Sequence, residues 1–199
     1  RRQRQMCIRD RYYIKHAESP SFPCMFHPCA FLLPGVSYDL PALMGERKVV
    51  FAMLLTVNIG NFNMLLAVYQ NNKMLFRSQL RTDPMKTADE YAIQLKNVLS
   101  LYGVSCEDLT GAIISCVAPA LTSSLKDAIL LLHKVRILTV GPGLKTGLNI
   151  KIDNPAQLGA DLVACAAAVR AKFPAPNVVI NFDTAISAMG IDKDGAVIG

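Results

Sequence analysis

The pattern of apolar and polar positions changes abruptly near residue 49. Before it, prolines recur and no hydrophobic period is sustained, so we predict that residues 1–48 form an irregular or disordered extension. This segment is either a basic, flexible arm or sequence ahead of a true start near Met53. From Val49 onward the signals become regular. The continuous apolar run at Val49–Val57 is typical of a strand that is buried on both faces.

The next apolar segments predict a three-stranded meander. Met64–Tyr69 and Met74–Arg81 have the length and composition of strands, and Gln70–Lys73 between them is typical of a hairpin turn. A first turn at Asn58–Asn61 separates these two strands from the run that precedes them. The meander is the antiparallel part of the predicted sheet.

Helical periods then alternate with further strands. Thr87 and Glu90 form a capping box at the start of a helix that Gly103 ends. Asn154, with Pro155 after it, predicts the start of a long Ala-rich helix that runs to about Lys172. The remaining predicted elements are a strand at Gly111–Val117, a helix at Leu121–Lys134, a strand at Val135–Val140, a strand at Asn177–Phe182 and a hairpin over Ile186–Val197.

This order of elements predicts the fold class. A meander followed by crossover units gives an α/β protein with a mixed sheet and helices on its faces, which is the ribonuclease-H-like topology. We predict a first lobe over residues 49–173 and the first strands of a second, truncated lobe over residues 174–199.

Charge changes this picture little. The formal net charge is +6, but residues 1–48 hold 8 Lys and Arg against 4 Asp and Glu, so most of the excess lies in the irregular segment. Nucleic-acid binding needs basic residues gathered on one face, and the later region has no such cluster. We therefore predict no nucleic-acid partner.

Cysteine usage indicates a reducing compartment, and hydropathy predicts that no signal peptide or membrane span is present. The last three of the six cysteines, Cys106, Cys116 and Cys165, lie in apolar or helical stretches without paired spacing. Cys24, His27 and Cys29 do not have a usual zinc spacing. No apolar run reaches the 18 residues of a membrane span, and Phe22–Leu33 is interrupted by prolines and a histidine. We predict a cytoplasmic protein without a membrane association.

Two Gly-containing turns and one acid are the candidate chemistry. The turn at Asn58–Asn63 is either an ordinary hairpin or a cradle whose backbone amides hold phosphate oxygens. The strand and turn at Leu55–Asn61 are echoed at Val179–Thr184. Gly141–Gly147 is also Gly-rich but lacks the spacing of a Walker-type loop. Asp161, expected in the middle of the Ala-rich helix, either faces solvent or is a partly desolvated proton acceptor for a substrate hydroxyl.

Together, these segments resemble type III pantothenate kinases. The resemblance rests on Asn58–Asn61, Thr87–Glu90, the segment from Gly141 through Asp161 and Asn181–Thr184, which occur in the family's order and at similar separations. It covers about residues 52–199. It implies a ribonuclease-H-like lobe of the acetate-kinase/hexokinase/actin superfamily, a homodimer, and phosphorylation of pantothenate in the first step of coenzyme A synthesis.

The resemblance also implies roles for residues. It implies ATP, Mg²⁺ or a similar divalent ion, and K⁺ or NH₄⁺ as cofactors, with Asp161 as the catalytic base. The residues implied to bind ATP are Asn58, Ile59, Gly60, Asn61, Phe62, Asn63, Met64, Leu65 and Thr184. Those implied to contact pantothenate are Ile152, Gly159, Ala160, Asp161 and Leu162, and Asn181 falls at the monovalent-cation position.

Several positions depart from the family pattern. Asn58 and Asn181 stand where Asp is usual, and Asp183 stands where Gly is usual. Leu162 replaces a common Arg, and Ile152 replaces a Tyr that often contacts substrate. Further departures are Phe62 and Ile186, both in place of Thr.

These departures, with the absence of most of the second lobe from the 199 residues, predict that this polypeptide alone has no kinase activity. The alternative function is a catalytically degenerate paralogue that binds nucleotide or pantothenate without turnover. A sugar or acetate kinase on the same fold would not explain the segment that ends in Asp161.

Overall fold

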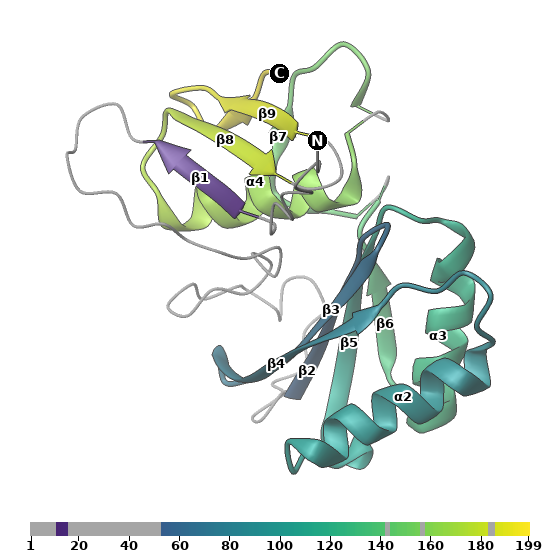
Figure 1. The fold of residues 1–199 in the computed structure, drawn as a ribbon. Helices are drawn as coiled ribbons and strands as arrows, with labels where there is room; N and C mark the ends of the chain where they lie inside the picture. The colour runs from purple at the N-terminus through teal and green to yellow at the C-terminus, as the bar shows by residue number, and fades with distance from the viewer. Residues whose placement is uncertain (1–10, 16–52, 142–143, 156–157, 183–185) are drawn as a thin grey trace, which may run out of the picture.

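The structure of the chain is a computed structural model. It describes residues 11–15, 53–141, 144–155, 158–182 and 186–199. Two sheets are present in these residues, each with helix packed against it (Figure 1). The cluster Cys24, His27 and Cys29 and the start of the predicted strand at residues 49–52 lie outside the described residues.

The first sheet has five strands in the order β4-β3-β2-β5-β6. Its strands are β2 Met53–Ile59, β3 Asn63–Gln70, β4 Lys73–Arg81, β5 Leu109–Cys116 and β6 Arg136–Thr139. β2, β3 and β4 form an antiparallel meander, while β5 pairs in parallel with β2 and β6. This is the ribonuclease-H-like topology that the element order predicts. The hairpin turn between β3 and β4 has Asn71 and Asn72 at positive φ, as the turn residues indicated.

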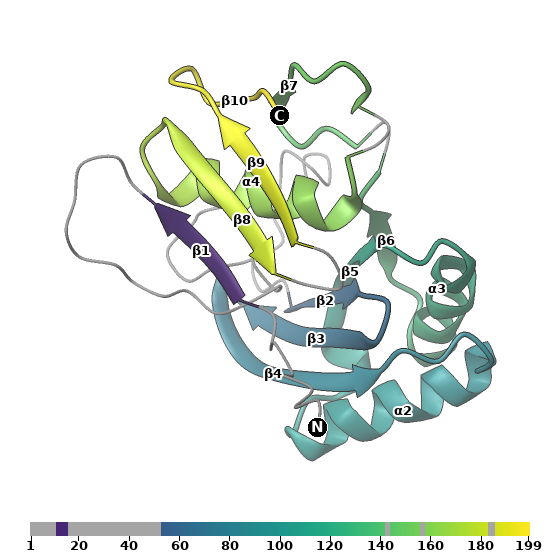
Figure 2. The same cartoon turned by 45° about the horizontal axis from the view of Figure 1, so that its top comes forward.

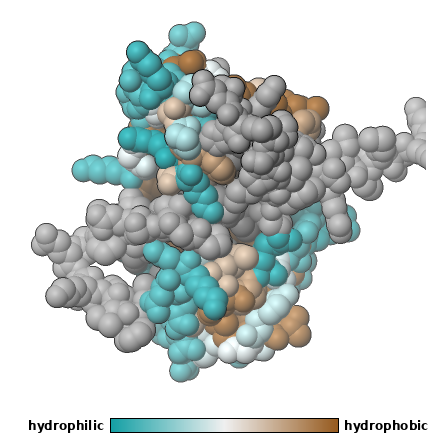
Figure 3. All heavy atoms as spheres, turned by 90° about the vertical axis from the view of Figure 1, so that its left-hand side faces the viewer, coloured by the Kyte–Doolittle hydropathy of each residue, from teal (hydrophilic) through white to brown (hydrophobic). Residues whose placement is uncertain are grey.

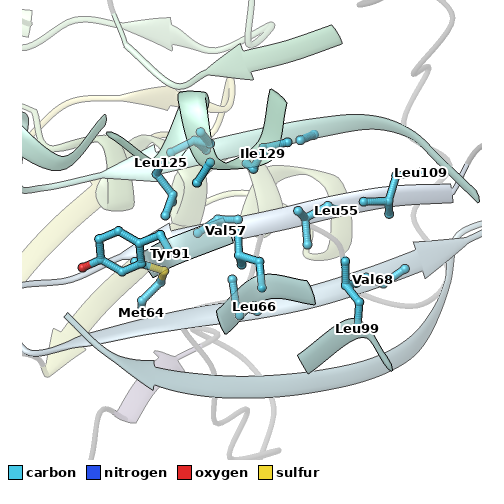
Figure 4. Close-up of a cluster of buried hydrophobic side chains, with 14 of the residues drawn as sticks. Leu55, Val57, Met64, Leu66, Val68, Tyr91, Leu99, Leu109, Leu125 and Ile129 are labelled. Atoms are coloured by element: carbon cyan, nitrogen blue, oxygen red, sulfur yellow. The ribbon is translucent and has the colours of Figure 1, made fainter. Parts of the chain in front are cut away.

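Two helices cover one face of this sheet. α2, Ala88–Leu101, begins at Thr87 with the predicted capping box, and Gly103 follows it at φ +70°. α3 spans Ala120–Leu132, and a short 3₁₀ turn, Cys106–Asp108, leads into β5. Beneath these helices lies the main hydrophobic core, in which Leu55, Met64, Tyr91 and Leu125 are almost fully buried (Figure 4).

The second sheet has the order β1-β8-β9-β10-β7 and packs against α4, Ala160–Lys172. Its strands are β1 Arg11–Lys15, β7 Asn149–Ile150, β8 Asn177–Phe182, β9 Ile186–Ile191 and β10 Ala196–Val197. Small residues such as Cys165 and Ala166 bring α4 close to Val179 and Met189 of the sheet. The predicted strand over Asn177–Phe182 and the hairpin after Ile186 are confirmed.

α4 links the two sheets, because it contacts β5 of the first sheet as well as β8 of the second. In Figures 1 and 2, α4 lies on the opposite side of the first sheet from α2. The boundary between lobes at residues 173 and 174 remains a proposal. That boundary assigns α4 to the first lobe, whereas the buried residues of α4 share a hydrophobic cluster with β8, β9 and β10 of the second sheet.

Three expectations need correction. Residues 11–15 form strand β1, paired antiparallel with β8, where we predicted no regular structure. Their short apolar segment finds its partner more than 160 residues away, which no local period can reveal. Asn58 and Ile59 also belong to strand β2 rather than to the turn, because both pair in register with β3 and β5.

The third correction concerns the start of the Ala-rich helix. It begins at Ala160 and not at Asn154 or Pro155, because the turn at Pro155 ends with the bond from Leu158 N–H to the Pro155 carbonyl. Gly159 then has φ −58° and ψ 149°, which is extended backbone, and its carbonyl accepts a helical hydrogen bond from Val163 N–H. Asp161 is therefore in the first turn of the helix and not in its middle.

The described part of the chain has a surface of mixed polar and apolar side chains. None of its helices combines the length and the apolarity that crossing a membrane requires. Among the residues coloured in Figure 3, hydrophilic ones are interspersed with separate hydrophobic patches. Phe62, in the turn after β2, is one of the large apolar side chains that remain exposed.

Candidate active site

The centre of the candidate site is a contact between Asp161 and Asn181. The side-chain amide of Asn181 donates a hydrogen bond to Asp161 Oδ2, with an Nδ2–Oδ2 distance of 3.3 Å. Asn181 lies on β8 and is 3% exposed, whereas Asp161 lies in the first turn of α4 and is half-buried. The positive end of the helix dipole favours a carboxylate at that position. The structure thus brings together two residues that the sequence places 20 positions apart.

Gly159 shapes the same site through its missing side chain. A Cβ atom built on Gly159 would lie 2.5 Å from Asp161 Oδ1, closer than such atoms ever approach. The backbone angles of Gly159 are ones that any residue adopts, so a side chain at 159 would disturb the position of the Asp161 carboxylate and not the backbone conformation. Glycine at 159 therefore allows the carboxylate of Asp161 to fold back toward the start of α4.

Two other predicted pantothenate contacts pack against the second cluster, the hydrophobic cluster that α4 forms with β8, β9 and β10. Ile152 and Leu162 are partly buried and pack against the buried residues of α4 and β8–β10. Ala160, also half-buried, is the first residue of α4. Leu162 contributes apolar surface at a position where the family resemblance implies an Arg, which would offer a charged side chain for ion pairing.

The predicted ATP turn is partly used by the fold itself. Gly60 N–H donates to the Asn63 carbonyl at 2.9 Å, and Thr82 Oγ1 donates to the Gly60 carbonyl at 2.9 Å. The Gly60 amide is therefore not available to a phosphate oxygen in this conformation. Asn61, Phe62 and Asn63 are exposed, so the accessible part of the turn is this tripeptide.

Three of the residues implied to bind ATP have core side chains. Ile59 and Met64 are fully buried under α2 and α3, and Leu65 is 5% exposed on the other face of the sheet. A nucleotide contact from these three positions would have to come from the backbone. Thr184 and Asp183 lie outside the described residues.

Asn58, the next-to-last residue of β2, lies beside a residue that sequence reasoning missed. Its neighbour across the parallel pairing with β5 is Ser115, which is 2% exposed. Both Asn58 Oδ1 and Ser115 Oγ are buried without a hydrogen-bond partner. Alternation along β2 puts Asn58 on the face opposite the main core, the side on which α4 lies. A polar residue at the exit of a predicted buried strand is the signal that would have found Ser115.

These oxygens permit a test of the implied cofactors. Asn58 Oδ1 is an unpartnered buried acceptor at the carboxyl end of a parallel strand, where ligands of open α/β sheets bind, so it fits a role near a phosphate-bound divalent ion. The neutral Asn58 does not balance the positive charge of such an ion. The part of the chain that the structure describes also holds no group of three or more His, Cys, Asp or Glu side chains placed to bind a metal.

The residues do not fit a monovalent cation shared between Asp161 and position 181. Such an ion needs oxygen atoms directed at it, whereas Asn181 turns an N–H donor toward the carboxylate. Asn181 Oδ1 is buried without a hydrogen-bond partner, but it is a single neutral oxygen. The geometry thus gives no support to the cation role implied for Asn181.

Comparison with known protein families gives one match to most of the chain. The profile of a family described as type III pantothenate kinase matches residues 54–199, which include both sheets except β1 and the first residue of β2.

Solved structures of low similarity include two larger proteins. One is a Bacteroides thetaiotaomicron protein with an actin-like ATPase fold and unknown function, with a TM-score of 0.31 and 10% identity over 44% of this chain and 32% of that one. The other is the Aquifex aeolicus member of the Ppx/GppA family, with a TM-score of 0.29 and 8% identity over 71% of this chain and 52% of that one. The chain thus spans about a third and about half of their lengths.

Proposed function

Because the chain belongs to the type III pantothenate kinase family, we propose that its protein transfers phosphate from ATP to pantothenate, giving 4'-phosphopantothenate in the first step of coenzyme A biosynthesis. The observation that carries this proposal is the placement of Asp161. Its carboxylate lies at the start of α4, over the space left by Gly159 and within hydrogen-bond reach of Asn181.

Asp161 has the chemistry of a general base for this reaction. The substrate hydroxyl oxygen forms a bond to the γ-phosphorus of ATP as the bond from that phosphorus to the bridging oxygen of ADP breaks. The hydroxyl proton goes to the carboxylate of Asp161. Since phosphoryl transfer depends mainly on positioning and charge stabilisation, a held carboxylate is the contribution that this site makes.

The other predicted site residues have supporting roles. Ile152 and Leu162 offer apolar surface to the chain of pantothenate, while the exposed turn Asn61–Asn63 at the end of β2 is the first-lobe candidate for phosphate contacts. ATP with a divalent ion supplies the phosphoryl group. The homodimer and the ATP contact of Thr184 remain predictions from the family resemblance, and the cytoplasmic location remains a prediction from cysteine usage and hydropathy.

A specific observation favours a second candidate, a paralogue that binds without turnover. The Asn181 amide donates to the same carboxylate that would accept the substrate proton. In addition, Asn58 and Asn181 supply no negative charge for a metal ion. Ligand binding would then persist while phosphoryl transfer is lost.

Pantothenate-dependent ADP release and calorimetric binding of pantothenate, measured on the full-length natural protein, separate these two functions. The kinase proposal predicts turnover that falls about 10²- to 10⁴-fold in Asp161→Asn, while the matched variant Asp153→Asn, at an exposed position of the preceding loop, keeps it. Binding without ADP release would establish the second function instead. If neither binding nor turnover occurs, both are wrong.

A further inference from the structure

Two asparagines of β8 face α4, and of these two only Asn181 forms a hydrogen bond with a charged group. Asn177 and Asn181 are each 3% exposed and lie on the same face of the strand as Val179. They are four positions apart on the strand, which corresponds to about 13 Å. Asn181 donates to Asp161, whereas both side-chain polar atoms of Asn177 lack a hydrogen-bond partner.

The charge at position 181 determines whether the Asp161 carboxylate requires a neighbouring cation. With aspartate at 181, two carboxylates would lie as close as Asn181 and Asp161 do now, and like charges at that distance in a partly buried site repel strongly. A cation between them would relieve the repulsion. Asparagine has almost the same shape but is neutral, and its N–H points at the Asp161 carboxylate.

We propose that the side-chain amide of Asn181 takes the place of a monovalent cation, so that this protein holds Asp161 in position without K⁺ or NH₄⁺. Asn181 is then a positioning residue, because it acts on substrate only through Asp161. The inference concerns the site of the proposed function, but it makes a claim about ion dependence that holds whether or not the protein turns over pantothenate.

Thermal unfolding in different salts tests this claim without any assay of turnover. The unfolding temperature of the unaltered full-length protein is measured in KCl, NH₄Cl and choline chloride at equal ionic strength and pH 8. We expect the same temperature in all three salts. A rise that is specific to K⁺ or NH₄⁺ would overturn the proposal, and this measurement needs no variant.

Asn181→Asp tests whether the amide is the cause. We expect its unfolding temperature to fall below that of the unaltered protein in choline chloride and to recover in part in KCl. Asn177→Asp is the matched control, since it puts the same charge at an equally buried position of the same strand, away from Asp161. It should lose stability without any recovery that is specific to K⁺.

A purely structural role for Asn181 would lower stability without creating dependence on an ion. Equal responses of the two aspartate variants to K⁺ would therefore overturn the proposal. Asn181→Leu gives a further check, because it removes the donor without adding charge. We expect Asn181→Leu to lower the affinity for pantothenate by calorimetry, with no recovery in KCl. Recovery in KCl would show that an ion binds there without a charged residue at 181, which contradicts the proposal.

Discussion

The two sheets of this protein bury their apolar surface in different ways. The first sheet buries large side chains such as Leu55 and Ile114 beneath two helices, and Leu125 of α3 belongs to the same core. The second sheet packs against one helix rich in small residues, and its buried face also carries Asn177 and Asn181. Apolar packing gives most stability per residue, whereas buried amides without partners reduce it. The face of the first sheet beneath α2 and α3 is therefore built for stability, whereas the face of the second sheet toward α4 carries polar groups of the candidate site.

The first sheet also has one apolar face and one face with buried polar side chains. Asn58 and Ser115 lie on the face opposite the main core, at the ends of adjacent parallel strands. α4, which carries Asp161, contacts β5 on the far side from α2. The candidate chemistry of both sheets thus lies toward α4, away from the main core.

The largest expected effect is on stability and comes from the first core. Leu125→Ala removes a fully buried side chain among large neighbours that cannot close the space, so we expect a loss of about 2–5 kcal/mol in the free energy of unfolding. Met189→Ala in the second cluster should cost less, because its partly buried neighbours can relax. Urea denaturation of both variants measures the difference. A larger loss in Met189→Ala would reverse the comparison between the sheets.

The second prediction concerns catalysis and uses two glycines. In Gly159→Ala the new methyl group would displace the Asp161 carboxylate. In the full-length natural protein, kcat/KM for pantothenate should therefore fall at least tenfold, and a tenfold fall corresponds to about 1.4 kcal/mol in the activation free energy. Gly141→Ala is the control, since a Cβ there meets nothing within 4 Å. Steady-state kinetics with both variants decides this. Similar rates would show that Asp161 does not need the space at 159.

Local signals predicted most of the first lobe from the sequence. Continuous apolar runs, the capping box at Thr87 and the turn residues after Gln70 each depend on neighbours within a few positions, and the structure confirms all of them. The start of α4 was wrong because Asn154 and Pro155 can open a single turn as well as a helix. What decides between the two is the extended backbone of Gly159, which the sequence does not show.

Contacts between distant segments could not be predicted from such signals. The pairing of β1 with β8, the adjacency of Asn58 and Ser115 and the bond from Asn181 to Asp161 all join residues from different elements. The resemblance to a family indicated Asp161 and Asn181 separately. Only the folded arrangement shows that the amide of one reaches the carboxylate of the other.

Two hydroxyl groups near the first turn give the third prediction. Thr82→Val removes the bond from Oγ1 to the Gly60 carbonyl, so we expect a loss of about 1 kcal/mol in the free energy of unfolding. Ser115→Ala removes a buried hydroxyl that has no partner, so stability should stay nearly unchanged or rise slightly. Chemical denaturation of the pair measures this. A marked loss of stability in Ser115→Ala would mean that the Ser115 hydroxyl stabilises the sheet and is not an unpaired group available to a ligand.

The smallest expected effect lies in the hairpin of the second sheet, which polar contacts hold at the surface. Asp192 Oδ1 accepts hydrogen bonds from Ala196 N–H at 2.8 Å and Asp194 N–H at 2.9 Å, and Lys151 Nζ lies 3.5 Å from Oδ2. The bond from Ala196 is the main reason that the pKa of Asp192 lies below its ordinary value of 3.8, and the Asp194 N–H and Lys151 lower the pKa further.

The sign of the pH dependence follows from that shift. A carboxyl group with a lower pKa in the folded state contributes stability above its unfolded pKa, and the contribution is lost as pH falls through the folded value. The unfolding temperature of the unaltered protein should therefore exceed that of Asp192→Asn at neutral pH, and the gap should narrow below about pH 4. Asp194→Asn is the control, because the hairpin uses the backbone N–H of Asp194 as a donor to Asp192. If the gap stays constant as pH falls, the hydrogen bonds of this turn do not depend on the charge of Asp192, and the hairpin of the second sheet is held by its apolar contacts after all.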